Sequence, residues 1–280
     1  MKTKYAHLNE LQQAELDILK EFIAICTRHQ LIYYIYGGTL LGAYRHKGFI
    51  PWDDDVDIAM PRKDFERFKS FLNEFPNYLY LDTVQMKGHS WTSAQIMDTR
   101  LKIKAGNAVN AIEKCVWVDI LIIDGVPNPK SLAFKLFGFA YLSARLLFKF
   151  SRFSDEVDLK MKRPWYERFF VKFAMVTHVE KVISQQFAGR LLDWVSRRYD
   201  LDKCEYVATL SGPTKLGEVQ PKSWFGIGRE MQFEDIVVNG MSKPEKFFEK
   251  YYGPNYMTPP PMDERNKHNV EIIESLIESK

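Results

Sequence analysis

The chain has 280 residues, of which 46% are hydrophobic and 27% charged, as is typical of a folded globular protein with one large or two small domains. Its formal net charge of +3 is too small to indicate a nucleic-acid-binding protein. No stretch of about 20 residues lacks charge, and the amino terminus lacks an apolar core, so neither a transmembrane helix nor a signal peptide is expected. Three widely spaced cysteines favour no zinc pair or disulfide framework and predict a cytoplasmic location.

The hydrophobic pattern predicts an α/β (α+β) fold. Apolar residues at steps of three and four predict a helix over about residues 8–29. A β-branched and aromatic run predicts a strand over residues 31–36, and Thr39 is expected to cap a short helix that ends at Tyr44. Further strands are predicted over residues 55–60, 78–84, 93–104 and 115–123, and further helices from Pro61 to about residue 75 and from Asp263 or Glu264 onward.

The character of the sequence changes after a predicted turn at residues 124–127, in which Asp124 precedes a glycine. Helix formers without clear alternation dominate residues 130–200. We therefore predict a core over residues 1–128, a helical insertion over 129–203, and a carboxy-terminal part, 204–280, that completes the core.

Carboxylates crowd the start of the strand predicted over residues 55–60. Residues i and i+2 of a strand share a face, so Asp55 and Asp57 are expected to lie together, with Cα atoms roughly 6.6 Å apart. Two carboxylates at this spacing can hold a hard divalent cation, Mg²⁺ or Mn²⁺, together with a nucleotide phosphate. Asp53 and Asp54 are second-tier candidates that bind another cation, orient water or cap the turn. The alternative is a solvated acidic turn.

Asp119 is the third candidate catalytic and metal-binding carboxylate. It interrupts an apolar run, residues 116–123, where an ionised carboxylate is costly unless it is paired or metal-bound. It therefore completes the metal site, accepts a proton from an attacking hydroxyl, or forms a structural ion pair with a basic residue.

A glycine pair precedes the acidic run and predicts a phosphate site. Gly37 and Gly38 allow backbone N–H groups to approach a phosphate just before a helix that Thr39 begins, so these three residues are the candidate phosphate-binding turn. Further candidates for contact with donor phosphates, each of which has an exposed or structural alternative, are Arg45 and Lys102 and, in the second tier, His46, Arg100 and His268.

These motifs resemble a known family. The segments YGGTLLGAYRH, residues 36–46, and IPWDDDVD, residues 50–57, are similar to the characteristic block of the LicD family, which includes the fukutin-like proteins. Weaker similarity follows at residues 118–125, at Phe233-Glu234 and over residues 252–260. The resemblance implies a nucleotidyltransferase-like mixed sheet flanked by helices.

The resemblance also implies a reaction. A CDP-linked donor such as CDP-choline would transfer phosphocholine, or a similar phospho-alcohol, to a hydroxyl of a cell-surface glycan in lipopolysaccharide, teichoic acid or capsule, with release of CMP. Asp55 and Asp57 would bind Mg²⁺ across the donor diphosphate. Two alternatives stay open: a nucleotidyltransferase that forms an NDP-activated product and releases pyrophosphate, and a non-catalytic protein that binds a nucleotide or glycan.

Residues 132–153 mix aromatic, aliphatic and basic side chains, as interfacial helices do. Glycan acceptors are often carried on a lipid, so we expect this segment to touch the inner face of the cytoplasmic membrane. The alternative is a helical pair packed on the core.

Overall fold

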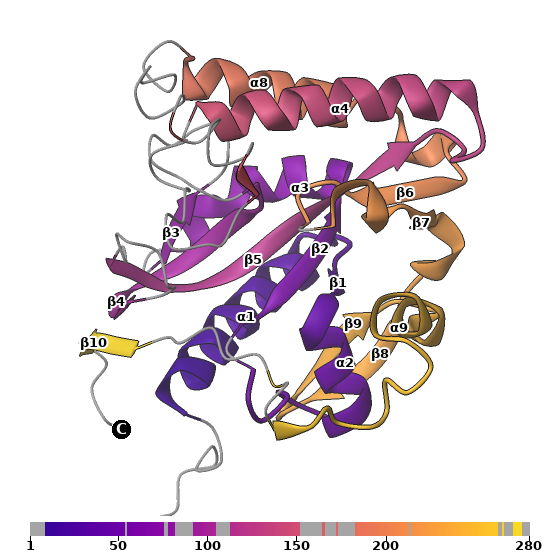
Figure 1. Ribbon diagram of the computed structural model, residues 1–280. Helices are drawn as coiled ribbons and strands as arrows, with labels where there is room; N and C mark the ends of the chain where they lie inside the picture. Colours follow the sequence, from indigo (N-terminus) through magenta and orange to yellow (C-terminus); the bar gives the residue numbers. More distant parts are fainter. Residues whose placement is uncertain are drawn as a thin grey trace, which may run out of the picture.

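The computed structural model has a mixed α/β fold (Figure 1). It describes residues 9–53, 55–75, 78–81, 92–104, 113–151, 164–165, 172, 183–212, 214–262, 265 and 271–275. The α-helices of this part of the chain are α1 (Glu10–Arg28), α2 (Gly37–His46), α3 (Arg62–Phe68), α4 (Leu132–Phe150), α8 (Gln185–Ser196) and α9 (Pro244–Tyr252). The 3₁₀ turns are η1 (Lys69–Glu74), η2 (Leu201–Lys203), η3 (Lys215–Glu218) and η4 (Lys222–Trp224).

The strands form one large sheet and one hairpin. The sheet strands are β1 (Tyr34–Ile35), β2 (Asp57–Pro61), β3 (Tyr78–Leu81), β4 (Ala94–Lys104), β5 (Glu113–Val126), β6 (Tyr206–Thr209), β7 (Gln220–Pro221) and β10 (Glu271–Ser275). They follow the order β1-β2-β5-β4-β10, with β3 also on β4, and with β6 joining β5 to β7. Only β2 and β5 are paired in parallel in the described sheet. The hairpin joins β8 (Arg229–Phe233) to β9 (Ile236–Gly240).

Helix α1 covers one face of the long strands β4 and β5 (Figure 1). Its start is fixed by a capping box, in which Asn9 Oδ1 accepts from the Gln12 N–H at 2.8 Å and Gln12 Oε1 accepts from the Asn9 N–H at 3.3 Å. Ile18 and Phe22 are fully buried and join Ile58 and Ile120 in the main core. Because side chains alternate along a strand, the residues beside these isoleucines, including Asp57 and Asp119, face the other side of the sheet.

A second hydrophobic cluster lies beneath the α4–α8 pair, which crosses the end of β5 and β6 at the top of Figure 1. One side of each helix packs inward, with Tyr141 and Phe148 of α4 and Ala188 of α8 fully or almost fully buried. Among the described residues, no helix combines the length and apolar character needed to cross a bilayer.

Several sequence predictions are corrected at the borders of elements. The strand expected over residues 31–36 is reduced to Tyr34–Ile35, and α2 begins at Gly37. Thr39 does not cap α2, because its Oγ1 accepts from the Asp57 N–H at 2.9 Å. Strand β2 begins at Asp57, so Asp55 precedes the strand and does not share a face with Asp57 through strand alternation.

Two further corrections concern the later half. Asp124 and Gly125 lie inside β5 and not in a turn, since Asp124 is buried in an ion pair with Arg62 and its strand neighbour pairs with β6. The predicted final helix is wrong over residues 271–275, which form β10 on the edge of β4; Asp263 and Glu264 lie outside the described residues. Pairing with the edge of β4 in the folded chain, which the local sequence pattern does not show, makes this segment a strand.

Candidate active site

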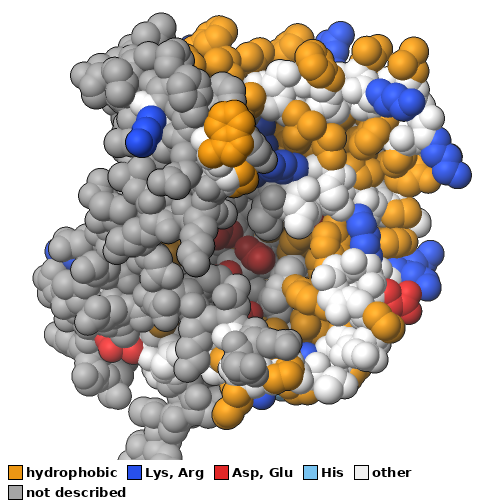
Figure 2. All heavy atoms as spheres, viewed as in Figure 1, with side chains coloured by type: hydrophobic (Ala, Val, Ile, Leu, Met, Phe, Trp, Pro, Cys, Tyr) orange, Lys and Arg blue, Asp and Glu red, His pale blue; other side chains and the backbone are white. Residues whose placement is uncertain are grey.

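Strand register brings Asp57 and Asp119 side by side. They are direct partners across the parallel β2–β5 pair, and the Asp119 N–H donates to the Val56 carbonyl at 2.9 Å. Neighbouring strands lie about 4.8 Å apart, so the two carboxylates leave the same face from adjacent backbones. Figure 2 shows acidic side chains recessed in a hollow near the middle of the molecule, close to where β2 begins in Figure 1.

The glycine pair closes over these acids. A Cβ atom added at Gly37 would lie 2.5 Å from Asp57 Oδ2, and one added at Gly38 would lie 2.7 Å from Asp53 Oδ2. Gly37 also has a φ of +54°, a backbone conformation that residues other than glycine rarely adopt. The first turn of α2 therefore lies against the carboxylates, and a side chain at either glycine would force a carboxylate to move.

Burial and repulsion act together on Asp57. Loss of hydration raises its pKa well above the ordinary value of 3.8, and the negative charges of Asp55, Asp119, Asp53 and Glu218 raise that pKa further. The groups that perturb the Asp57 pKa most strongly among the described residues are thus all carboxylates. Such a site favours a bound proton or a bound cation.

Asp119 is held by three donors. Its Oδ1 accepts from Ser93 Oγ at 2.7 Å and from Gln95 Nε2 at 2.9 Å, and its Oδ2 accepts from Trp117 Nε1 at 2.9 Å. A carboxylate offers about four lone-pair sites, so about one stays available. Hydrogen bonds of this kind fix the orientation of metal-ligating carboxylates. Within the part of the chain that the structure describes, Asp119 forms no ion pair with a basic residue; its three partners are neutral donors.

The donor set suits a cation that arrives with a substrate phosphate. Within the described residues, no three acidic, histidine or cysteine side chains form a ready-made metal cage. Mg²⁺ is commonly held by one or two carboxylates, with phosphate and water oxygens in the remaining positions. Gln95 Oε1, buried beside Asp119, has no hydrogen-bond partner among the described residues and adds a further oxygen acceptor to this region.

A buried polar network that the sequence motifs did not reveal lies next to the carboxylates. The Tyr36 hydroxyl donates to Glu218 Oε2 at 3.0 Å, and Glu218 also accepts from the hydroxyls of Thr209 and Thr214 at 3.2 and 2.7 Å. Gln220 Nε2 donates to the Tyr36 hydroxyl at 3.1 Å. The network joins Tyr36, just before α2, to β6, η3 and β7, which lie more than 170 residues later in the sequence, and a local pattern does not encode such a contact.

Two other residues near the acids also escaped the sequence predictions. Gln12 of α1 donates through Nε2 to the Asp53 carbonyl at 2.9 Å and so ties the acidic loop to the capping box. Tyr252, at the end of α9, has a pKa raised first by burial and then by the charges of Asp57, Asp53 and Asp55. Tyr252 is the first residue of the segment 252–260, which has weak similarity to the LicD family. That similarity draws attention to the segment but assigns Tyr252 no role.

Arg45 and His46 lie at the end of α2, on the rim of the site. Arg45 Nη1 donates to the Tyr256 carbonyl at 2.8 Å, and its guanidinium lies 6.0 Å from the centroid of the Trp52 ring. Burial lowers the Arg45 pKa, while Asp53 opposes that change. Burial and the neighbouring Arg45 charge lower the pKa of His46. Arg45 is thus a cation within electrostatic range of the acidic loop.

The structure does not bring the β4 cations to the Asp57–Asp119 pair. Lys102 is opposite Cys115, four residues from Asp119 along β5, which is roughly 13 Å of strand. Arg100 donates to Asp98 Oδ2 at 2.6 Å and is affected by Asp17 of α1, so it lies on the α1 side. Asp54 and His268 lie outside the described residues.

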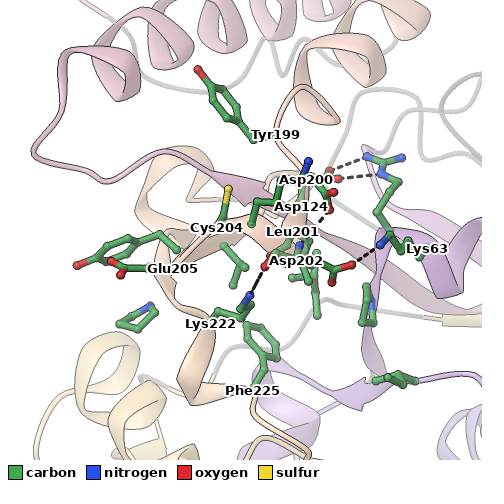
Figure 3. Close-up of a pocket in the computed structure, with 18 of the residues that line it drawn as sticks. Lys63, Asp124, Tyr199, Asp200, Leu201, Asp202, Cys204, Glu205, Lys222 and Phe225 are labelled. Carbon is green, nitrogen blue, oxygen red and sulfur yellow. Dashed lines mark hydrogen bonds and ion pairs between the residues drawn. The ribbon is translucent and has the colours of Figure 1, made fainter.

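A large cavity lies away from these acids. It has a volume of about 1170 Å³ and is lined by residues from the end of β2, from 197–207 and from 221–226, with none of the candidate acids in its wall. Figure 3 shows Lys63 directed at Asp202 and Lys222 at the backbone near Leu201. Because Lys63 is paired with Asp202 and Lys222 donates to the backbone carbonyls of Leu201 and Asp202, we interpret this wall as structural.

Replacing Gly37 by alanine tests the closed approach of α2 to the acids. We expect Gly37→Ala to lower turnover at least about tenfold, because the new methyl group displaces the Asp57 carboxylate from its position. Gly253→Ala is the control for backbone strain, since Gly253 has a φ of +79° and an added Cβ would meet no atom of the described residues within 4 Å. Both variants should melt at lower temperature, and an unchanged rate in Gly37→Ala would contradict the geometry.

Comparison with known proteins identifies the region that carries these residues. Residues 30–121 match the model described as LicD/FKTN/FKRP, nucleotidyltransferase domain. The lipopolysaccharide cholinephosphotransferase LicD of Haemophilus influenzae is 28% identical over 278 residues, which covers 94% of this chain and 96% of that protein. An uncharacterized protein of Rickettsia prowazekii is 38% identical over 112 residues, 40% of each chain.

The matched segment contains the glycine pair, the acidic loop, β2 and most of β5 up to Asp119. The motifs that suggested the family are therefore those that fold together around the acidic hollow. This confirms the resemblance seen in the sequence: residues 30–121 match the LicD/FKTN/FKRP nucleotidyltransferase domain, and nearly the whole chain is similar to a LicD protein.

Proposed function

We propose that this protein is a phosphotransferase that moves phosphocholine, or a closely similar phospho-alcohol, from a CDP-linked donor to a hydroxyl of a lipopolysaccharide-type glycan. The observation that supports it best is the Asp57–Asp119 pair beside the glycine turn, within a LicD-family domain. Similarity to a lipopolysaccharide cholinephosphotransferase along nearly the whole chain supports the choice of donor and acceptor class.

In this proposal Asp57 and Asp55 hold Mg²⁺ or Mn²⁺ and Asp119 supplies a further oxygen. The metal, when bound, would offset negative charge on the donor diphosphate and on the departing CMP. The three hydrogen bonds to Asp119 favour a fixed ligand over a proton acceptor. Backbone N–H groups at the start of α2 and the Arg45 guanidinium are the candidate contacts for the donor phosphates.

The acceptor hydroxyl would attack the phosphorus that carries the alcohol, and the bond from that phosphorus to the CMP oxygen would break. In a nucleotidyltransferase with the same acids, a phosphate oxygen of the phospho-alcohol would attack the α-phosphorus of CTP, and the bond from that phosphorus to the departing pyrophosphate would break. The acidic site serves both reactions equally. The products therefore distinguish them.

The test is incubation of the purified protein with lipopolysaccharide, Mg²⁺ or Mn²⁺, and separately CDP-choline, CDP-ethanolamine, CDP-glycerol and CDP-ribitol. We expect acceptor-dependent release of CMP with one of these donors, loss of that release in EDTA, and recovery when the metal is restored. Pyrophosphate formed from CTP and a phospho-alcohol would establish the rival reaction. Binding of donors without turnover, under every metal and acceptor condition, would indicate a non-catalytic protein.

A further inference from the structure

The α4–α8 pair is apolar on its outer side as well as on its inner side. Along α4, large side chains recur at steps of three and four on the exposed surface: Leu132, Leu136, Phe139, Leu142 and Leu146. Phe139 is 76% exposed, whereas Tyr141, on the opposite side of the same helix, is fully buried. A helix that only covers a core has one apolar side, so the second side needs another explanation.

Helix α8 continues this surface with aromatic residues. Phe187 and Trp194, seven residues apart and therefore on one side of the helix, are 61% and 59% exposed. The two helices pack against each other, so their outer sides form one surface, which we name the α4–α8 outer face. Figure 2 shows hydrophobic side chains gathered over α4 along the upper edge of the molecule, with basic side chains among them.

The charge on this face has one sign. Helix α4 contains no acidic residue, and the one acid of α8, Asp193, is ion-paired with Arg62 and Arg197. Exposed basic residues flank the apolar stripe: Lys135 and Lys149 on α4, Arg190 on α8, and Arg198, whose guanidinium lies 5.7 Å from the Trp194 ring centroid. Aromatic residues with adjoining cations are the pattern of a helix that lies in a lipid interface.

We propose that the α4–α8 outer face docks on the surface of an anionic lipid bilayer. The inner sides of both helices stay packed on Val126, Ala208 and Leu210, so the helices lie in the plane of the interface. A second copy of this chain is a poorer occupant, because two such faces would bring cations together without acidic partners. The docking concerns binding alone and is independent of the transfer reaction.

The test is flotation of the purified protein with phosphatidylcholine vesicles and with vesicles that also contain phosphatidylglycerol, without donor or metal. The protein should float with the anionic vesicles at low salt and much less at high salt, and bind neutral vesicles weakly. Phe139→Ser combined with Trp194→Ser should weaken anionic-vesicle binding at least about tenfold, because two aromatic side chains no longer enter the interface.

Two further variants separate the contributions. Lys135→Glu combined with Lys149→Glu should weaken binding to the anionic vesicles but not to the neutral ones. Ile227→Ser removes an apolar side chain that is 99% exposed outside the α4–α8 outer face, and it should float like the unmodified protein. Far-UV circular dichroism and melting temperatures show that each variant is folded.

Absence of flotation at both salt concentrations would overturn the proposal, as would normal flotation of the aromatic double variant. Light scattering that shows a dimer in the unmodified protein and a monomer in the same variant, without lipid binding, would assign the face to self-association instead. None of these measurements uses turnover, so the test of membrane docking can be interpreted even if the proposed transfer reaction is wrong.

Discussion

Asp57→Asn is expected to lower the transfer rate at least about a hundredfold while the fold is kept, because the substitution removes the negative charge that would hold the metal but preserves the shape of the side chain. Asp57 begins β2, lies against Gly37 and is the register partner of Asp119. Release of CMP from CDP-choline, measured with saturating Mg²⁺ and lipopolysaccharide, checks the rate. Asp202→Asn is the matched control: Asp202 is an exposed acid paired with Lys63, and its loss should leave turnover unchanged.

The same variant should be more heat-stable than the unmodified protein when EDTA is present. The folded-state pKa of Asp57 lies well above 3.8, so the folded protein binds this proton more tightly than the unfolded chain does. Stability is therefore lost as pH rises from about 3.8 through the folded-state pKa. The gain from Asn should accordingly be larger at pH 8 than at pH 5 in thermal denaturation.

With metal and donor present, the unmodified protein should become more heat-stable than Asp57→Asn. Mg²⁺ with a CDP-alcohol stabilises the unmodified protein through binding to the folded state, and it should have a much smaller effect on Asp57→Asn. Near-normal turnover of Asp57→Asn, or equal stabilisation of both proteins by metal and donor, would refute the assignment of Asp57 to the metal site.

The helices and strands that depend on a local sequence pattern were mostly predicted correctly. The helix at residues 10–28 is evident from its period, and the strand that carries Asp57 follows from its apolar alternation. Asp119 was singled out because a carboxylate in an apolar strand needs a partner. The sequence could not predict that Asp119 lies directly opposite Asp57, because the register of two parallel strands far apart in sequence is set only in the folded sheet.

What the sequence missed depends on contacts between distant segments. Glu218 is one acid among 36 acidic residues, and only the fold places it under Tyr36 and next to Asp57. Thr39 was predicted to cap a helix, but the nearby Asp57 N–H bonds its hydroxyl instead. Asp124 was predicted in a turn because Asp-Gly is common in turns, yet Arg62, which directly follows the neighbouring strand β2, pairs with it inside a strand.

Arg62→Met should be among the most destabilising single substitutions in the described part of the chain, with a loss of about 3–5 kcal/mol, because it leaves a buried carboxylate without its partner. Arg62 donates to both oxygens of Asp124, at 2.8 and 2.6 Å, and to Asp193 at 2.8 Å. Asp124 is almost completely buried. Urea denaturation at pH 7 measures the loss as a lower midpoint with an unchanged slope.

Two companion variants make that result specific to the buried charge. Lys63→Met removes the neighbouring cation, whose pair with Asp202 is exposed, and should produce no measurable loss of stability. Arg62→Met combined with Asp124→Leu removes both charges and should recover part of the stability, because no unpaired carboxylate stays buried. Equal losses in Arg62→Met and Lys63→Met would contradict the argument.

Asp57 and Asp124 thus make opposite predictions although both are carboxylates on or beside the same sheet. Asp124 has a cationic partner, so disturbing its pair should cost stability and leave the rate per folded molecule unchanged. The strongest charged neighbours of Asp57 are other carboxylates, so neutralising it should cost activity and raise stability in EDTA. Measuring rate and stability for both sites distinguishes a carboxylate that holds the fold together from one that the fold keeps ready for a cation.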